Sequence, residues 1–78
     1  MKSYKGIFSK MGEQLLEKYV EDLKKEIQEK GEDTELLFKL GVCYVRVKHI
    51  DKAREVYKRL KEIDQTKAKK LLDIIYEV

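Results

Sequence analysis

The apolar residues of this chain recur at intervals of three and four, the spacing that places side chains along one face of an α-helix. Over residues 9–30 this spacing predicts one amphipathic helix, whose apolar stripe is formed by Leu16, Val20, Leu23 and Ile27. Ser9 is placed to cap the helix at its start, and Gly31 is placed to end it in a left-handed cap. We therefore expect a first helix that buries one face and exposes a charged one.

A second helix is predicted to run to about Val47, with either Asp33 or Thr34 as its cap. Apolar residues lie almost all the way round it: Leu36, Leu37, Phe38, Leu40, Val42, Cys43, Tyr44, Val45 and Val47. A helix that is apolar on every side is buried among other elements. We therefore expect this helix to lie at the centre of the fold.

Two further helices follow, each preceded by a short turn. Residues 48–50 form the first turn, and Asp51 opens a helix whose apolar positions are Ala53, Val56, Tyr57, Leu60 and Ile63. Residues 64–66 interrupt the pattern, and Thr66 is placed to cap a last helix over 66–78 with Leu71, Leu72, Ile74, Ile75 and Val78. Turns this short join antiparallel neighbours. The sequence thus predicts a single all-α domain over 1–78, made of four antiparallel helices.

The composition supports helices and removes several other classes. The 78 residues include no Pro, no Trp and only four Gly, so the residues that build hairpins and phosphate-binding loops are nearly missing. Because 42% of residues are charged and 42% hydrophobic, the chain is neither a disordered polyampholyte nor a membrane span. Lys and Glu dominate its charged residues and Asn is absent, a bias that resembles heat-adapted proteins.

A single Cys and a single His limit the chemistry that the chain can perform. They exclude an intrachain disulfide and cannot supply the three or four Cys and His ligands of an ordinary zinc site. Cys43 lies among apolar residues, which is typical of a small core side chain, and His49 lies in a predicted solvated turn. The pair Glu32 and Asp33 stands where a helix begins, as capping and the helix dipole favour. We therefore expect no catalytic residues, no metal and no cofactor, and hence no enzyme.

Residues 34–65 carry a pattern of defined spacing, formed by Leu37, Leu40, Gly41, Tyr44, Ala53, Tyr57, Leu60 and Asp64. In this pattern the chain resembles the tetratricopeptide repeat (TPR) family, whose repeat is a helical hairpin. The resemblance implies an array of helical hairpins arranged as an α-α superhelix, with a hairpin at 34–63. Gly41 and Ala53 would allow two helices to cross closely, with Tyr44 and Tyr57 filling the space beside them.

Three residues of the chain differ from the family pattern, and the helices before and after the hairpin each resemble half of a repeat. Leu37 stands where the family most often has Trp, Leu60 where it prefers Ala, and Gln65 where it prefers Pro. We expect the bulk of Leu60 to splay the hairpin. Leu71 follows Leu37 by one repeat length, 34 residues, so the helix at 66–78 would begin another repeat and serve as a cap. The helix at 9–30 would be the second half of an earlier repeat.

The resemblance also implies a binding face. In this family the first helix of each hairpin lines a concave surface, which here would be formed by Glu35, Phe38, Lys39, Val42, Val45 and Arg46. Family members that grip a C-terminal carboxylate have Lys and Asn where this chain has Phe38 and Val42, which argues against that ligand class. A leftover apolar patch usually marks an interaction site. We therefore expect a homodimer at micromolar concentration, or a complex with an apolar helix or peptide.

Two functional hypotheses remain open at this point. The first is a noncatalytic protein–protein interaction module, a scaffold or small assembly subunit; the alternative is a basic helical protein that binds nucleic acid or an anionic surface. The net charge is +3, and acidic neighbours dilute the basic clusters at 24–25, 58–61 and 67–70, so solvated helix faces are favoured and nucleic acid is not.

The first ten or so residues leave their own alternatives open. Tyr4, Ile7, Phe8 and Met11 form either an amphipathic turn that packs onto the bundle or an arm that binds a partner. This segment has no apolar run of the length that a secretory signal requires, and no transmembrane segment is present in the sequence. We therefore expect a cytoplasmic protein.

Overall fold

The computed structural model describes residues 12–77, and within them every regular element is an α-helix. The helices are α2 (Glu13–Lys30), α3 (Thr34–Arg46), α4 (Ile50–Ile63) and α5 (Gln65–Glu77). The expectation of an all-α chain with four helices is confirmed for this range. Helix α2 begins at Glu13 after an extended Gly12, so the prediction of a helix start at residue 9 is wrong. Ser9 itself and the segment that contains Tyr4, Ile7, Phe8 and Met11 lie outside the described residues.

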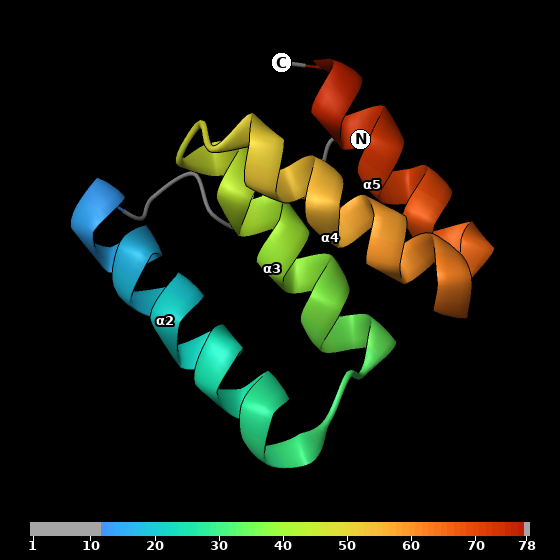
Figure 1. Cartoon of the computed structure of the whole chain (residues 1–78). Helices are drawn as coiled ribbons and strands as arrows, with labels where there is room; N and C mark the ends of the chain where they lie inside the picture. The colour runs from blue at the N-terminus through green and yellow to red at the C-terminus, as the bar shows by residue number, and fades with distance from the viewer. Residues whose placement is uncertain (1–11, 78) are drawn as a thin grey trace.

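Helix α3 lies at the centre of the arrangement and packs against each of the other three described helices. Figure 1 shows α3 between α2 and α4, with consecutive helices running in opposite directions, and α5 also packs along α4. None of the described helices has the length and apolar character needed to cross a membrane. The connections are short because each helix turns directly back onto its predecessor.

The hydrophobic core follows from this central position of α3. Eight residues of α3 are buried, from Leu37 to Val45 with Lys39 excepted. The other helices contribute one face each, formed by Leu16, Val20, Leu23, Ala53, Val56, Leu60, Ala68, Leu71, Ile74 and Ile75. Most of the apolar positions that the spacing predicts therefore lie in the core, but Ile63, predicted on the apolar face of α4, is 45% exposed. No charged side chain within the described range is buried in the core.

Aspartates cap two of the helices. The Asp33 carboxylate accepts hydrogen bonds from the backbone N–H groups of Glu35 (2.7 Å) and Leu36 (3.4 Å), which selects Asp33 over Thr34 as the cap of α3. The Asp64 carboxylate accepts from the N–H of Lys67 at 3.1 Å, so α5 begins at Gln65. The prediction that Thr66 caps this helix is therefore wrong, because the single residue that ends α4 also caps α5.

Two positions at helix ends have a positive φ angle. Gly31 ends α2 at φ 90° and ψ 176°, which needs glycine but differs from the left-handed helical cap expected there. Lys48, after α3, has φ 68°. Around it, the N–H of His49 donates to the carbonyl of Tyr44 and the N–H of Lys48 donates to that of Val45, which is the Schellman arrangement. Such a position usually holds glycine.

Gly41 allows a close approach, but to a different helix from the one expected. A Cβ atom added at Gly41 would lie 2.5 Å and 2.9 Å from the two Cδ atoms of Leu71 in α5. The expectation that Gly41 makes room for the helix of Ala53 is therefore wrong. The reason is that α5 packs directly on α3, so that a leucine side chain occupies the space that glycine leaves.

Candidate interaction surfaces

The residues predicted to line a concave face fall into two groups in the structure. Glu35 and Lys39 are exposed and Arg46 is partly buried. Phe38, Val42 and Val45 are only 6%, 2% and 3% exposed. The expectation of an open, mostly apolar ridge is therefore wrong, because a helix with three neighbours has little of its circumference left to face solvent.

Contacts with α5 show how the expected ridge is covered. The Nζ atom of Lys67 lies 5.8 Å from the centre of the Phe38 ring, and it also pairs with the Glu35 carboxylate at 2.7 Å. A lysine stem laid over an aromatic ring shields the ring while its ammonium reaches a polar partner. The physical reason for expecting self-association through Phe38, Val42 and Val45 thus does not hold in the folded chain.

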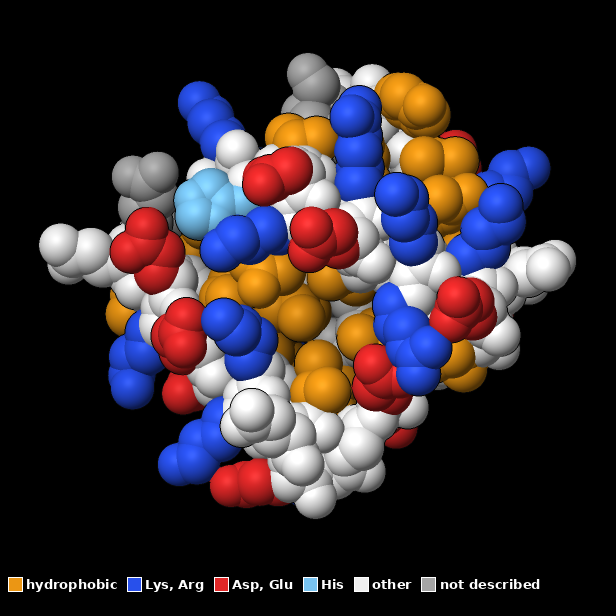
Figure 2. All heavy atoms as spheres, in the orientation of Figure 1, with side chains coloured by type: hydrophobic (Ala, Val, Ile, Leu, Met, Phe, Trp, Pro, Cys, Tyr) orange, Lys and Arg blue, Asp and Glu red, His pale blue; other side chains and the backbone are white. Residues whose placement is uncertain are grey.

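A different surface is hollowed and partly apolar. It is a groove of about 420 Å³ between α2 and the end of α3, lined by Gln14, Glu17, Lys18, Val20, Glu21, Lys24, Tyr44, Val47, His49 and Lys52. Figure 2 shows hydrophobic side chains near the middle of this side of the molecule, with acidic and basic side chains around them. The groove therefore offers an apolar floor with charges of both signs at its rim.

Tyr44 organises one end of this groove. Its ring stacks on the ring of His49, with centroids 6.3 Å apart and planes at 18°, and the Nζ of Lys52 lies 5.9 Å from the Tyr44 centroid. Burial raises the pKa of the Tyr44 phenol, while the nearby charge of Lys24 lowers it by less. His49 is exposed in a turn, as predicted, but sequence reasoning missed its stacking on Tyr44. In the sequence, only the tight turn predicted at 48–50 indicated that these two rings could come together.

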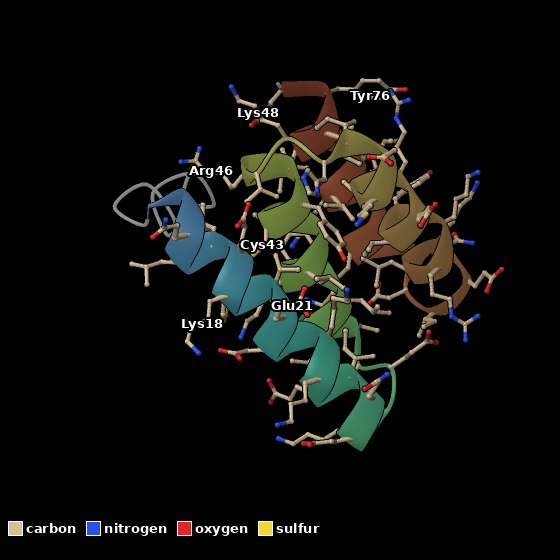
Figure 3. The ribbon with its side chains drawn as sticks, turned by 60° about the vertical axis from the view of Figure 1, so that its left-hand side comes forward. Lys18, Glu21, Cys43, Arg46, Lys48 and Tyr76 are labelled. Atoms are coloured by element: carbon tan, nitrogen blue, oxygen red, sulfur yellow. The ribbon has the colours of Figure 1, made fainter. Side chains whose placement is uncertain are left out.

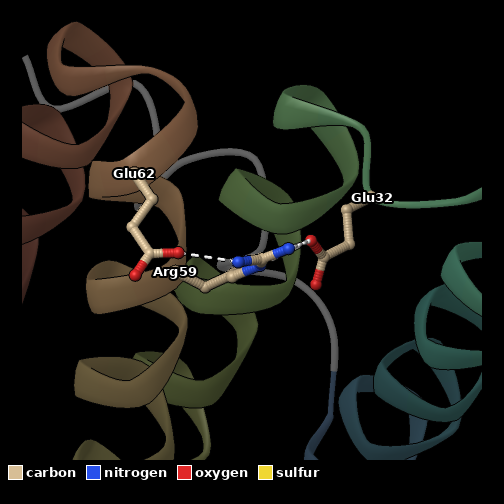
Figure 4. A network of polar contacts seen from close by, with 3 residues as sticks. All are labelled: Glu32, Arg59 and Glu62. Atoms are coloured by element: carbon tan, nitrogen blue, oxygen red, sulfur yellow. Dashed lines mark hydrogen bonds and ion pairs between the residues drawn. The ribbon is translucent and has the colours of Figure 1, made fainter.

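A charged network ties the loop before α3 to α4. The Arg59 guanidinium donates to the Glu32 carboxylate at 2.5 Å and to that of Glu62 at 2.6 Å (Figure 4). These hydrogen bonds, with Glu32 first, raise the pKa of Arg59 above its usual value. Two residues of the predicted basic clusters, Lys24 and Lys67, also pair with carboxylates, those of Glu21 and Glu35. Parts of each basic cluster are therefore locally neutralised.

The remaining candidate side chains are placed as structural residues. Cys43 is fully buried, which confirms its prediction as a core side chain, and burial raises the pKa of its thiol to about 11. Among residues 12–77 no group of three or more potential metal ligands comes together. The large exposed apolar side chains of Leu15, Ile63 and Tyr76 lie on three different helices, and such isolated residues are normal on surfaces.

The raised pKa of Cys43 leads to a prediction about reactivity. At pH 8 a pKa of about 11 leaves about one thiolate in a thousand, whereas the ordinary value of 9.0 leaves about one in ten. We expect an alkylating reagent to label Cys43 at least about a hundredfold more slowly in the folded chain than in urea. Since the folded pKa is raised, the stability from the neutral thiol is complete below pH 9 and is lost as the pH rises toward 11. Mass spectrometry over time gives both rates, and equal rates would contradict the prediction.

Comparisons of the chain with models of known protein families, with curated proteins and with solved structures found no match.

Proposed function

We propose that this protein is a noncatalytic protein–protein interaction module built on one TPR-like hairpin, α3 with α4, between two flanking half-repeats. Two packing features support the TPR-like part. Helix α3 contacts α5 as well as α4, as the first helices of successive repeats would. Leu71 lies one repeat length after Leu37, and its side chain occupies the space beside Gly41. The two flanking helices then cover what a single hairpin would leave exposed.

The observation that carries the proposal is the groove between α2 and the end of α3. An apolar floor with a polar rim is the usual anatomy of a protein–protein contact. Its volume of about 420 Å³ is that of a small-ligand pocket, so it accommodates a few side chains of a partner rather than a whole helix. Val20, Tyr44 and Val47 form the floor but are only 6%, 8% and 7% exposed, so a partner would contact mainly the exposed rim side chains, among them Lys18 and Glu17.

Binding of nucleic acid or an anionic surface has less support as the main function. Arg59, Lys24 and Lys67, one from each predicted basic cluster, are each paired with a carboxylate of the chain itself. A paired cation releases fewer counterions from a phosphate backbone than a free one. A protein partner, whose own charges can match a rim of both signs, suits this surface better.

A pair of matched variants tests the groove. Glu17 lines it and Glu29 does not, yet both are exposed glutamates of α2. We expect Glu17→Trp to fill the groove and lower partner affinity at least about tenfold, and Glu29→Trp to leave it unchanged. The measurement is capture of partners from a lysate by each variant, followed by calorimetry with the partner identified, after circular dichroism shows that both variants are folded.

Two outcomes would contradict the proposal. One is equal binding of the partner by both tryptophan variants, which would place the contact elsewhere. The other is a captured partner that is nucleic acid, with affinity falling by orders of magnitude between low and moderate salt. Binding through an apolar floor predicts only a weak dependence on salt, because few counterions are released.

A further inference from the structure

A second hollow, separate from the groove, collects positive charge at one end of the helical bundle. It has a volume of about 480 Å³ and is lined by Val45, Arg46, Lys48, Ile50, Arg54 and Ile75. Figure 3 shows Arg46 and Lys48 at the same end of the molecule as Tyr76 of α5. Among the residues that the structure describes, three cationic side chains and no acidic side chain line this hollow, and it shares none of them with the groove.

The three cations of this hollow lie together without carboxylate partners. Within the described part of the chain, neither Arg46, Lys48 nor Arg54 makes an ion pair, whereas Lys30 and Arg59 do. The Nε atom of Arg46 is moreover buried with no hydrogen-bond acceptor. A buried donor without an acceptor destabilises a fold, more so when it belongs to a charged group.

The helix dipoles explain only part of this charge. Arg46 and Lys48 lie at the carboxyl end of α3, where cations are favoured. Arg54, in contrast, is the fifth residue of α4, beyond the first turn in which the dipole acts, so the dipole does not account for its position. The acidic residue in the first turn of α4, Asp51, does not line the hollow. The hollow therefore holds more positive charge than the neighbouring helix ends require.

The backbone conformation of Lys48 is an independent reason to expect that its side chain has a role beyond exposure to solvent. Its φ of 68° is one that glycine adopts without cost and a lysine does not. Nothing in the backbone of this turn requires a side chain at position 48, since both Schellman hydrogen bonds involve backbone atoms only. The side chain is thus present despite the local conformation.

We propose that this hollow binds the phosphate group of a small organic phosphate monoester. Two guanidinium forks and an ammonium match a dianion with three acceptor oxygens better than they match a single carboxylate. Of the apolar lining residues, Ile50 is partly exposed and would contact an apolar body next to the phosphate, whereas Val45 and Ile75 are 3% and 4% exposed and lie behind it. Because no aromatic side chain of residues 12–77 lines the hollow, a stacked base is not the preferred body. This site is independent of the proposed protein-binding groove.

The test uses butyl phosphate, inorganic phosphate, butanoate and an oligothymidylate without a terminal phosphate as probes. NMR spectra of the full chain, labelled with ¹⁵N, give dissociation constants from the amide shifts. We expect butyl phosphate to bind with a Kd of about 1 mM or below and to shift the amides of 46–54. Inorganic phosphate should bind more weakly, because it lacks the aliphatic contacts, and butanoate at least about tenfold more weakly.

Two variants separate a site from general charge attraction. Lys48→Gly removes one cation and relaxes the backbone, so it should weaken butyl phosphate binding about tenfold while the melting temperature stays the same or rises. Arg54→Gln should weaken binding similarly, whereas Lys58→Gln, which removes the same charge from an exposed position of α4 outside the hollow, should not. The glycine variant keeps the test valid, because its effect does not come from unfolding.

Three results would overturn this inference. The first is the absence of saturable shifts with butyl phosphate in the wild type. The second is an equal loss of affinity in Lys58→Gln and Arg54→Gln, which would indicate general electrostatic attraction. The third is tighter binding of butanoate or of the oligothymidylate than of butyl phosphate, which would assign the hollow to carboxylates or to a nucleic-acid backbone. None of them affects the groove, since the two surfaces share no residue.

Discussion

Replacing Gly41 by leucine is expected to lower the free energy of unfolding by about 2–4 kcal/mol, because it overpacks the contact between α3 and α5. Even a single Cβ at this position would lie 2.5 Å from a Cδ atom of Leu71, and because Leu71 is fully buried, its side chain must shift within the core. Leucine gains about 1 kcal/mol over glycine in helix propensity, which offsets only part of the loss. Urea titrations followed by circular dichroism measure the change.

The matched control for this prediction removes the obstructing side chain. Gly41→Ala alone should destabilise less than the leucine variant, because one methyl group demands a smaller shift. In the double variant Gly41→Ala with Leu71→Ala, the new methyl enters the space that the leucine vacates. The loss of unfolding free energy in the double variant should therefore be smaller than the sum of the losses in the two single variants. A change below about 0.5 kcal/mol for Gly41→Leu would show that α3 and α5 do not approach closely at this position.

The helices themselves could be predicted from the sequence because their cause is local. The spacing of Leu16, Val20 and Leu23 defines a face of α2 wherever that helix packs, and an apolar α3 must be central in any arrangement. The packing partners have no such local cause. A small residue such as Gly41 indicates that something approaches closely, but either α4 or α5 satisfies that pattern, and the structure selects α5.

The candidate surfaces were harder to predict for the same reason. The resemblance assigned Phe38, Val42 and Val45 to an open face, whereas the structure buries all three. The groove and the cationic hollow each combine residues from elements far apart in sequence, so no local motif marks them. Of the residues assigned to the concave face, Val45 and Arg46 line the cationic hollow, but with neighbours that the sequence pattern did not connect to them.

The TPR resemblance and the observed packing predict different outcomes for a substitution at Leu60. From the packing, we expect Leu60→Ala to lower the free energy of unfolding by about 2–5 kcal/mol. The TPR pattern favours alanine at this position, so by that pattern alone the substitution should be tolerated and should relieve a splayed hairpin. In the structure, however, the Leu60 side chain is fully buried within the core, and truncating it leaves a cavity that rigid neighbours fill only in part. For a chain of this length the loss is a large share of a total stability of about 4–12 kcal/mol.

The control for Leu60→Ala is the same truncation at Leu15, which is 58% exposed on α2 and should change the stability by less than about 0.5 kcal/mol. Urea midpoints with unchanged slopes would attribute both changes to the folded state rather than to a change in the unfolded chain. A Leu60→Ala variant as stable as the wild type would mean that α4 can move inward to close the cavity. The hairpin would then tolerate the alanine that the TPR pattern favours at this position, and the buried Leu60 side chain would not be needed for its stability.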